Sequence, residues 1–324
     1  MHSLKLFLSA GIIAMLAITC KAPSATQSTP NKFRVLGYLP GNNNWSAAIA
    51  AIDLTAITDL NMAFINPDTN GNFVANEALK QAVAKAHSNK IRVFASIGGG
   101  NPPPYLASLL ANDKRAALIA SLVALAEQNN FDGIDVDIEN DLINENYAPF
   151  VKELATALKQ KNKLMTSALA SWNASLIGDS TLQLYDFINI MSYDKTGPWT
   201  PLNPGQHSPL MMAQNDFIYF NTTRHIPAEK LLIGLPFYGY GFGNGAPESL
   251  SYTNIVATYS GSENQDSLIV QGGGIIYYNG ISTIQQKVLF AINNKAAGVM
   301  IWQLLGDSKD EKSLLRVINS AIKK

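Results

Sequence analysis

From residue 33 to the end of the chain, short apolar runs alternate with longer segments whose apolar residues recur at helical spacing. The apolar runs predict eight strands: 34–39, 59–65, 92–97, 133–139, 165–170, 187–193, 231–237 and 299–303. The longer segments predict helices at 77–88, 114–128, 147–160, 210–220, 283–294 and 309–322. Strands alternating with helices predict an α/β fold, the closed (β/α)8 or TIM barrel. A doubly wound open sheet is the alternative, but no Gly-x-Gly-x-x-Gly motif follows the first predicted strand.

The first nineteen residues have the pattern of a signal peptide. Lys5 precedes an uncharged, mostly apolar stretch, residues 6–19, that is too short to span a bilayer as a helix. Cys20 follows directly and is expected to be the lipidation site of a bacterial lipoprotein; a plain signal peptide with an incidental cysteine is the alternative. Residues 20–32 are rich in Ser, Thr, Pro and Ala and are expected to form the flexible tether of the lipid-anchored protein. We therefore expect a bacterial protein that is secreted or held as a lipoprotein at the cell surface or outer membrane.

Composition limits the domain organisation and the binding partners that we expect. No linker rich in proline and glycine interrupts residues 33–324, so this part is expected to be one domain. Basic and acidic residues balance at 24 each and no basic run occurs, so nucleic acid is not an expected partner. The single cysteine excludes an intramolecular disulfide, and the four histidines show no metal-ligand spacing. We expect no metal or other cofactor, membrane contact only through the lipid anchor, and a monomer.

One predicted strand carries an unusual row of acidic residues. Apolar and acidic residues alternate along 131–139, which places Asp135, Asp137 and Glu139 on one face of the strand. Three neighbouring carboxylates are costly because each disfavours the ionisation of the next. A metal site and a solvated acidic face are the alternatives, but calcium loops need a flexible glycine-containing turn rather than a stiff apolar strand. The row therefore favours acid–base chemistry.

Other polar, small and aromatic residues lie at the ends of predicted strands, where a barrel collects its catalytic groups. They are found in the segments 96–100, 187–194, 234–239 and 298–303. Residues 132–139 also match the Asp-Gly-x-Asp-x-Asp-x-Glu signature of the family 18 glycoside hydrolases, and the other segments resemble that family's pattern in the proper order. The chain thus resembles a family 18 glycoside hydrolase (chitinase-like) from about residue 34 to residue 307.

The resemblance implies catalytic roles. Glu139 matches the general acid, and Asp137 the residue that orients the substrate's 2-acetamido group and stabilises the positive oxazolinium formed from it. Asp135 is expected to share a proton with Asp137, and Tyr193 to donate a hydrogen bond to the acetamide oxygen. In this family the acetamide oxygen itself attacks C1, so no second carboxylate serves as nucleophile.

The resemblance also implies substrate contacts. Trp302 matches the aromatic floor under the sugar at the cleaved bond, and Met191, Asp194 and Tyr238 match secondary contacts. Trp199 is a candidate sugar platform, with simple loop packing as the alternative.

Ser96 and Gly98, at the end of the third predicted strand, are further candidates for substrate binding. Trp45 and Trp172 are weaker candidates. One departure stands out: Tyr240 occupies a position where many relatives carry arginine, which leaves the outer sugar contacts open.

We expect, on this resemblance, a retaining, chitinase-like hydrolase of β-1,4-linked N-acetylglucosamine. An endo-β-N-acetylglucosaminidase acting on the chitobiose core of N-glycans is the first alternative, and a catalytically weak chitin- or glycan-binding protein is the second. Only about sixty residues separate the last two predicted strands, too few for the large insertion domain of some relatives. A shallow cleft and endo-type cleavage are therefore expected.

Overall fold

The computed structural model describes residue 1, residues 33–41 and residues 44–323. The signal peptide, Cys20 and the tether lie outside the described residues. Within the described part of the chain, no helix combines the length and apolar character needed to cross a membrane.

Eight parallel strands form a closed barrel in the order β1-β12-β7-β6-β5-β4-β3-β2. Their bounds are β1 Arg34–Pro40, β2 Asp59–Ala63, β3 Arg92–Gly98, β4 Gly133–Asp137, β5 Leu164–Leu169, β6 Phe187–Ile190, β7 Leu231–Pro236 and β12 Gly298–Trp302. The barrel closes because β1 pairs with β12 on one side and with β2 on the other. The predicted (β/α)8 fold is confirmed.

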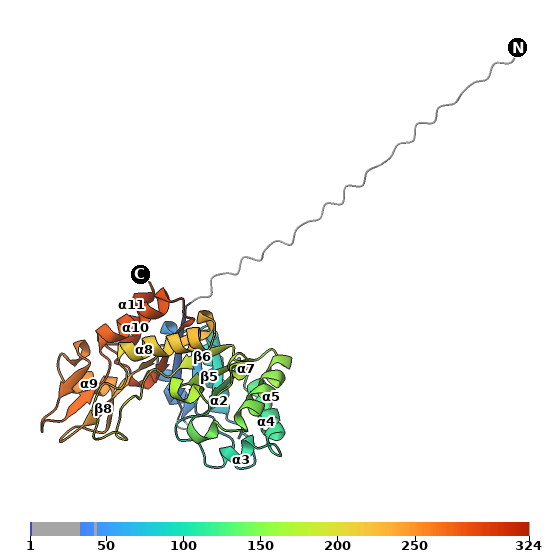
Figure 1. The fold of residues 1–324 in the computed structure, drawn as a ribbon, viewed down its shortest axis with the longest axis horizontal. Coiled ribbons are helices and arrows are strands. Elements are labelled where there is room, and N and C mark those ends of the chain that lie inside the picture. Colours follow the sequence, from blue (N-terminus) through green and yellow to red (C-terminus); the bar gives the residue numbers. More distant parts are fainter. Residues whose placement is uncertain (2–32, 42–43, 324) are drawn as a thin grey trace. The chain divides into compact units, whose positions relative to one another are not determined.

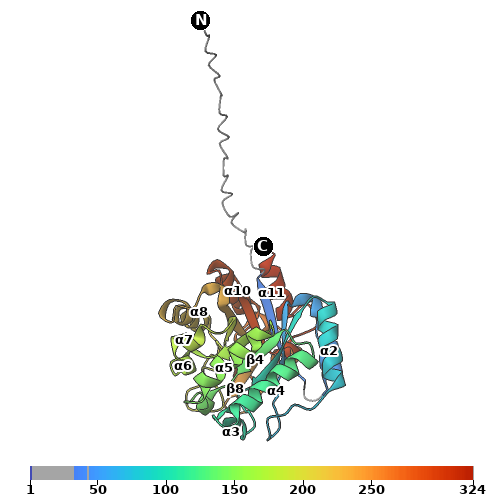
Figure 2. The ribbon, with the colours of Figure 1, turned by 90° about the vertical axis from the view of Figure 1, so that its right-hand side faces the viewer.

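Helices surround the barrel; Figure 2 shows α2, α4 and α5 around β4. Their bounds are α1 Trp45–Ala50, α2 Glu77–Ser88, α3 Leu106–Leu110, α4 Arg115–Gln128, α5 Tyr147–Gln160, α6 Ser171–Ala174, α7 Asp179–Leu182, α8 Leu210–Ile218, α10 Ile281–Asn293 and α11 Leu314–Ile322. Local sequence explains why α2 has the predicted bounds. Asn76 caps its first turn by accepting a hydrogen bond from the Leu79 amide at 3.0 Å, and its buried residues recur at helical spacing.

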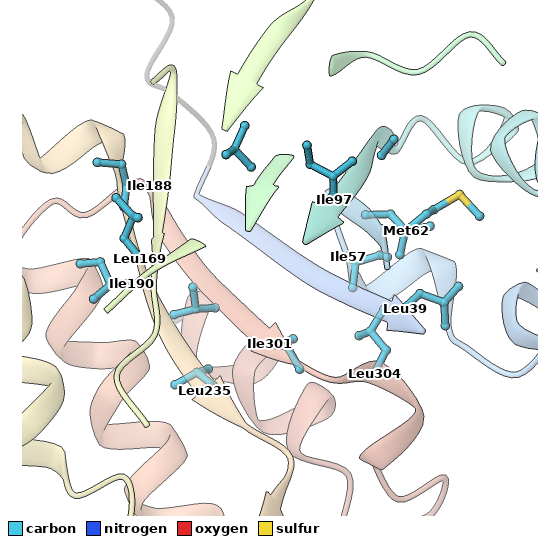
Figure 3. Packing of buried hydrophobic residues seen from close by; sticks show 14 of the residues in the cluster. Leu39, Ile57, Met62, Ile97, Leu169, Ile188, Ile190, Leu235, Ile301 and Leu304 are labelled. Carbon is cyan, nitrogen blue, oxygen red and sulfur yellow. The ribbon is translucent and has the colours of Figure 1, made fainter. Parts of the chain in front are cut away.

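The residues of the barrel strands contribute alternately to two separate cores, because successive side chains point to opposite faces of a strand. Figure 3 shows part of the outer core, between strands and helices, which includes Leu39 and Ile301. The inner core fills the barrel and includes Tyr38, Phe94 and Met300.

Strand β4 follows the same rule, as the sequence predicts. Ile134 and Val136 belong to the outer core, whereas Asp135 and Asp137 are buried polar residues on the other face of the strand. The acidic row therefore lines the inside of the barrel.

Two predicted strands end earlier than expected. β4 stops at Asp137 and β6 at Ile190, so Glu139 and Tyr193 lie just beyond their strands. In each case a residue with left-handed backbone follows: Asn140 has a φ of 53° and Asp194 a φ of 63°.

A small antiparallel sheet lies between β7 and β12. Its strands are β8 Tyr238–Phe242, β9 Ser249–Ser251, β10 Ser267–Ile269 and β11 Ile275–Tyr277, in the order β10-β11-β8-β9, with helix α9 Tyr252–Thr258 beside them. Figure 1 shows β8 and α9, in orange, to one side of the barrel. The expected absence of a large insertion holds, but the sequence pattern gave no indication of this sheet. Three of its strands have only three residues each, too short to show alternation.

Candidate active site

The three carboxylates of the acidic row lie at increasing height in the barrel. Asp135 is fully buried, Asp137 is 3% exposed, and Glu139, beyond the end of β4, is partly exposed. The row of three carboxyl groups thus runs from the buried interior of the barrel to its solvent-facing mouth.

Asp135 is held by four donors from four other strands. Tyr38 Oη and Ser96 Oγ donate to Oδ2 at 2.7 and 2.8 Å, while Thr166 Oγ1 and Asn189 Nδ2 donate to Oδ1 at 2.6 and 3.2 Å. Burial raises the pKa of Asp135, and the hydroxyl donors oppose that rise because they stabilise the ionised form. Since a carboxylate offers about four acceptor positions, Asp135 is saturated.

Asp137 and Glu139 form a pair of interacting carboxyl groups. Burial, followed by the negative charges of Glu139 and Asp135, raises the pKa of Asp137 well above its usual value. Burial also raises the pKa of Glu139 to about 7, with a further contribution from Asp194, while its hydrogen bond with Asp137 opposes the rise. At neutral pH the pair therefore keeps a proton between its two carboxyl groups.

This geometry changes the partner expected for Asp137. We expected Asp135 to share a proton with Asp137, but the oxygens of Asp135 are filled by neutral donors and the hydrogen-bond partner of Asp137 is Glu139. Asp137 Oδ1 is buried without a hydrogen-bond partner. An unpaired buried oxygen is costly, which makes it a ready acceptor for a ligand donor.

Tyr193 lies beside this pair with its hydroxyl weakly engaged. Its Oη is 3.7 Å from the sulfur of Met300, a poor acceptor. Burial and then the charge of Asp137 raise the pKa of Tyr193 well above its usual value, so the phenol keeps its proton. Gly234 makes room for this ring, because a Cβ there would lie 2.9 Å from Tyr193 Cε1.

Trp302 is partly exposed at the end of β12 and packs between two aromatic rings. Its ring centroid is 5.6 Å from both Phe64, which stacks on it, and Tyr38, which meets it edge-on. These neighbours hold the indole in one orientation. Met191 is buried in the inner core that Trp302 packs against.

Asp194 is the centre of an outer cluster. Tyr238 Oη donates to its Oδ1, and His207 Nδ1 lies 3.6 Å from the same atom. Tyr240, at the position where arginine was expected, packs against Tyr238 and His207 at centroid distances of 5.4 and 5.1 Å. Burial lowers the pKa of His207, so its imidazole is neutral near pH 7. The cluster therefore places no guanidinium beside Asp194.

A cleft of ≈ 780 Å³ begins at Glu139 and Asp194. Trp172 and Trp199 line it and are 49% and 55% exposed, and Met211 from α8 is also exposed on its wall. Trp199 also packs edge-on against Tyr240 at 5.2 Å, so it takes part both in the cleft and in loop packing.

Two candidate binding residues, Ser96 and Gly98, lie beneath the site rather than on its surface. The Ser96 hydroxyl already donates its hydrogen bond to Asp135. Gly98, at a φ of 97°, allows the backbone to approach Asp137, because a Cβ there would lie 2.1 Å from the Asp137 carbonyl oxygen. We correct both to supporting residues. Trp45 is likewise buried in the outer core.

The sequence reading did not single out Phe64 or His207. Phe64 lies within the predicted strand 59–65 and just after the observed β2, and no motif marks it. The four histidines, His207 among them, show no metal-ligand spacing. Among the described residues, no group of three or more His, Cys, Asp or Glu side chains is arranged to hold a metal ion.

The chain is similar to known proteins in both sequence and structure. A family 18 chitinase from the chitin utilization locus of Flavobacterium johnsoniae is 35% identical, with a TM-score of 0.80 over 90% of this chain and 94% of that one. A chitinase from Bacteroides thetaiotaomicron is 27% identical, with a TM-score of 0.78 over 90% and 96%. Human chitinase-3-like protein 2 is 26% identical over 71% of this chain and 73% of its own. The sequence profile of glycosyl hydrolases family 18 matches residues 34–307, and the chain therefore belongs to this family.

Proposed function

We propose that the protein is a chitinase-like glycosidase that hydrolyses β-1,4 bonds of N-acetylglucosamine oligomers with retention of configuration. The observation that carries this proposal is the Asp137–Glu139 pair, which keeps a proton near neutral pH at the point where the cleft begins. A catalytic acid works best when its pKa lies near the working pH.

Glu139 is the proposed proton donor to the glycosidic oxygen. It is the uppermost carboxyl of the row and lines the cleft, whereas the two aspartates are buried below it. Asp194 raises the pKa of Glu139 and thereby helps to keep it protonated before the bond breaks.

The substrate's own acetamide is the proposed nucleophile. The unpaired oxygen of Asp137 can accept the acetamide N–H, and the Tyr193 hydroxyl, held only by the weak acceptor Met300 Sδ, can donate to the acetamide oxygen instead. As the oxazolinium forms, its positive charge gains stabilisation from Asp137 and from the buried charge of Asp135. Glu139 gives its proton to the departing glycosidic oxygen and is left as a carboxylate. It then accepts a proton from the incoming water as the water oxygen bonds to C1 and the C1–O bond of the oxazolinium breaks, which restores both the acetamide and the protonated Glu139.

An open cleft with apolar walls favours a linear run of sugars as substrate. Trp302, partly exposed at the end of β12, offers a flat face for the sugar at the cleaved bond. Trp172 and Trp199, which line the cleft, offer further faces. The chitinases of similar structure, one of them from a chitin utilization locus, support the same substrate class. Internal cleavage fits a barrel that carries only a small four-stranded sheet between β7 and β12 and no large insertion domain.

Product analysis tests this proposal. Purified protein is incubated with chitooligosaccharides and separately with a high-mannose glycoprotein, and products are read by mass spectrometry and by NMR before mutarotation. We expect shorter chitooligosaccharides whose first product is the β-anomer. Faster release of intact glycans would favour an endo-β-N-acetylglucosaminidase, an α-anomeric first product would exclude substrate assistance, and binding without products would favour a lectin-like protein.

We also propose that the protein is carried to the cell surface and anchored by a lipid on Cys20. The support is the sequence pattern alone, since Cys20 lies outside the described residues. The Cys20→Ser variant should lose both membrane partitioning and labelled palmitate when produced in a bacterial host. A wild-type protein that takes up no palmitate would leave residues 1–19 as a plain signal peptide.

A further inference from the structure

A lysine is buried completely behind one wall of the cleft. Lys287 belongs to α10 and is 0% exposed. Its Nζ donates to Ser208 O at 2.8 Å, to Ser208 Oγ at 2.6 Å and to Asn279 Oδ1 at 2.7 Å. Three acceptors match the three N–H donors of an ammonium group, whereas a neutral amine has only two.

Ser208 connects this lysine to the active site. Its hydroxyl donates to Ser192 O at 2.5 Å, and Ser192 lies between Met191 and Tyr193 in the chain. Ser208 also closes the loop that carries Asp194 and Trp199. The two sides of this loop are joined by hydrogen bonds from the Lys195 amide to His207 O and from Thr196 Oγ1 to Gly205 O.

Asn279 connects the same lysine to the small sheet. Its Nδ2 donates to Ser208 O at 3.0 Å, and Gln206 Nε2 donates to Tyr278 O at 2.6 Å. Lys287 is therefore the point where α10, the exit of the small sheet and the loop after β6 meet.

The charged and titratable groups around Lys287 come from each packed element. Asp216 of α8 and Asp266 beside the small sheet are the carboxylates that favour its charged form, and His207 lies on the loop next to Ser208. Asp216 accepts from Ser171 Oγ at 2.7 Å and lines the cleft. Among the described residues no carboxylate forms an ion pair with Lys287. Its ammonium therefore acts through the three hydrogen bonds.

We propose that Lys287 is a positioning residue whose charge holds the wall formed by residues 193–199, and so sets the affinity for oligosaccharides long enough to reach Trp199. The inference rests on the proposed function, because it assumes that oligosaccharides occupy the cleft. Burial lowers the pKa of Lys287 to about 7, so the third hydrogen bond is lost as the pH rises through neutrality. Binding of a long oligosaccharide should then weaken relative to a short one.

Calorimetry in the Glu139→Gln background tests this. Affinities for chitohexaose and chitobiose are measured at about pH 6 and about pH 8.5, on either side of the lysine's pKa of about 7. A change in protonation of Asp135 or Asp137 with pH affects the binding of both oligosaccharides. It therefore cancels in the ratio of the chitohexaose affinity to the chitobiose affinity. We expect the ratio of the chitohexaose affinity to the chitobiose affinity to fall roughly tenfold with rising pH, as for loss of a charged hydrogen bond. In Glu139→Gln/Lys287→Met the ratio should be low and independent of pH.

Two further variants keep the test decisive. Ser208→Ala retains the lysine but removes the link to Ser192, and it should also lower the ratio; it carries the test if Lys287→Met does not fold. Lys163→Met is the matched control, because Lys163 donates to Phe131 O at 2.6 Å just before β5, at the opposite end of the barrel. It should keep the parental ratio and pH response.

Three results would overturn the proposal. A ratio that does not change with pH in the parent, or parental ratios in both the Lys287 and Ser208 variants, would remove the role of Lys287 while leaving the proposed function standing. Failure of the parent to bind either oligosaccharide would instead remove the proposed function and the inference together.

Discussion

Tyr38 Oη donates a hydrogen bond of 2.7 Å to Asp135 Oδ2, joining the first strand of the barrel to the fourth across its interior. This contact helps to fix a negative charge at the base of the site. That charge raises the pKa of Asp137, one step higher on the same strand. Burial and the charge of Glu139 contribute more to the raised pKa of Asp137, and the saturated carboxylate of Asp135 adds to them.

The general acid is tested by Glu139→Gln, which removes the transferable proton but keeps the size of the side chain. Loss of general acid catalysis should lower kcat by about 10²–10⁴-fold on chitooligosaccharides. Circular dichroism and oligosaccharide affinity should stay close to wild type. Retention of more than roughly a tenth of the wild-type rate would show that another group donates the proton.

The pH dependence of kcat/KM follows from the raised pKa of Glu139. The acid must be protonated, and its pKa is about 7, so activity should be retained below neutrality and fall as the pH rises through that value. Above it the rate should drop roughly tenfold per pH unit until another step takes over. Asp194→Asn removes a charge that raises this pKa, so the alkaline limb should move to lower pH. A limb that stays in place would mean that Asp194 does not tune the acid.

The support for the oxazolinium is tested by Asp137→Asn. The substitution leaves Glu139 in place but removes the carboxylate whose Oδ1 lies unpaired in the site. We expect kcat to fall by at least about 10²-fold, since loss of one such electrostatic contact typically costs that much. A thiazoline mimic of the intermediate should inhibit the wild type and bind the variant more weakly. Equal inhibition of both proteins would argue against contact between Asp137 and the intermediate.

Much of the barrel could be predicted because each element carries its own local signal. The alternation along β4 predicts that Asp135 and Asp137 share one face of the strand, and the 3.6-residue spacing predicts the full lengths of α2 and α5. Such signals depend only on which face of one element is apolar. They are independent of the rest of the chain.

What could not be predicted depends on contacts between distant residues. The sequence around Lys287 is that of an ordinary surface residue on an amphipathic helix. Lys287 is buried because the segments that carry Ser208 and Asn279 pack over it. The saturation of Asp135 by Tyr38 and Asn189 needs strands far apart in sequence. It leaves Glu139, two residues further along the same face, as the carboxyl that interacts most strongly with Asp137.

The aromatic rim of the cleft is tested by Trp199→Ala. Trp199 is 55% exposed, lines the cleft and is supported from one side by Tyr240, so its free face can receive a sugar ring. Stacking of this kind contributes about 0.5–1.5 kcal/mol, which predicts a two- to tenfold rise in KM for chitohexaose. Chitobiose has only two sugar rings and so can occupy fewer subsites, and we expect its affinity to change less. Leu202→Ala is the control, because Leu202 lies on the same loop, is 90% exposed and does not line the cleft. Equal weakening of both oligosaccharides by Trp199→Ala would show that the indole supports the loop rather than a distant sugar.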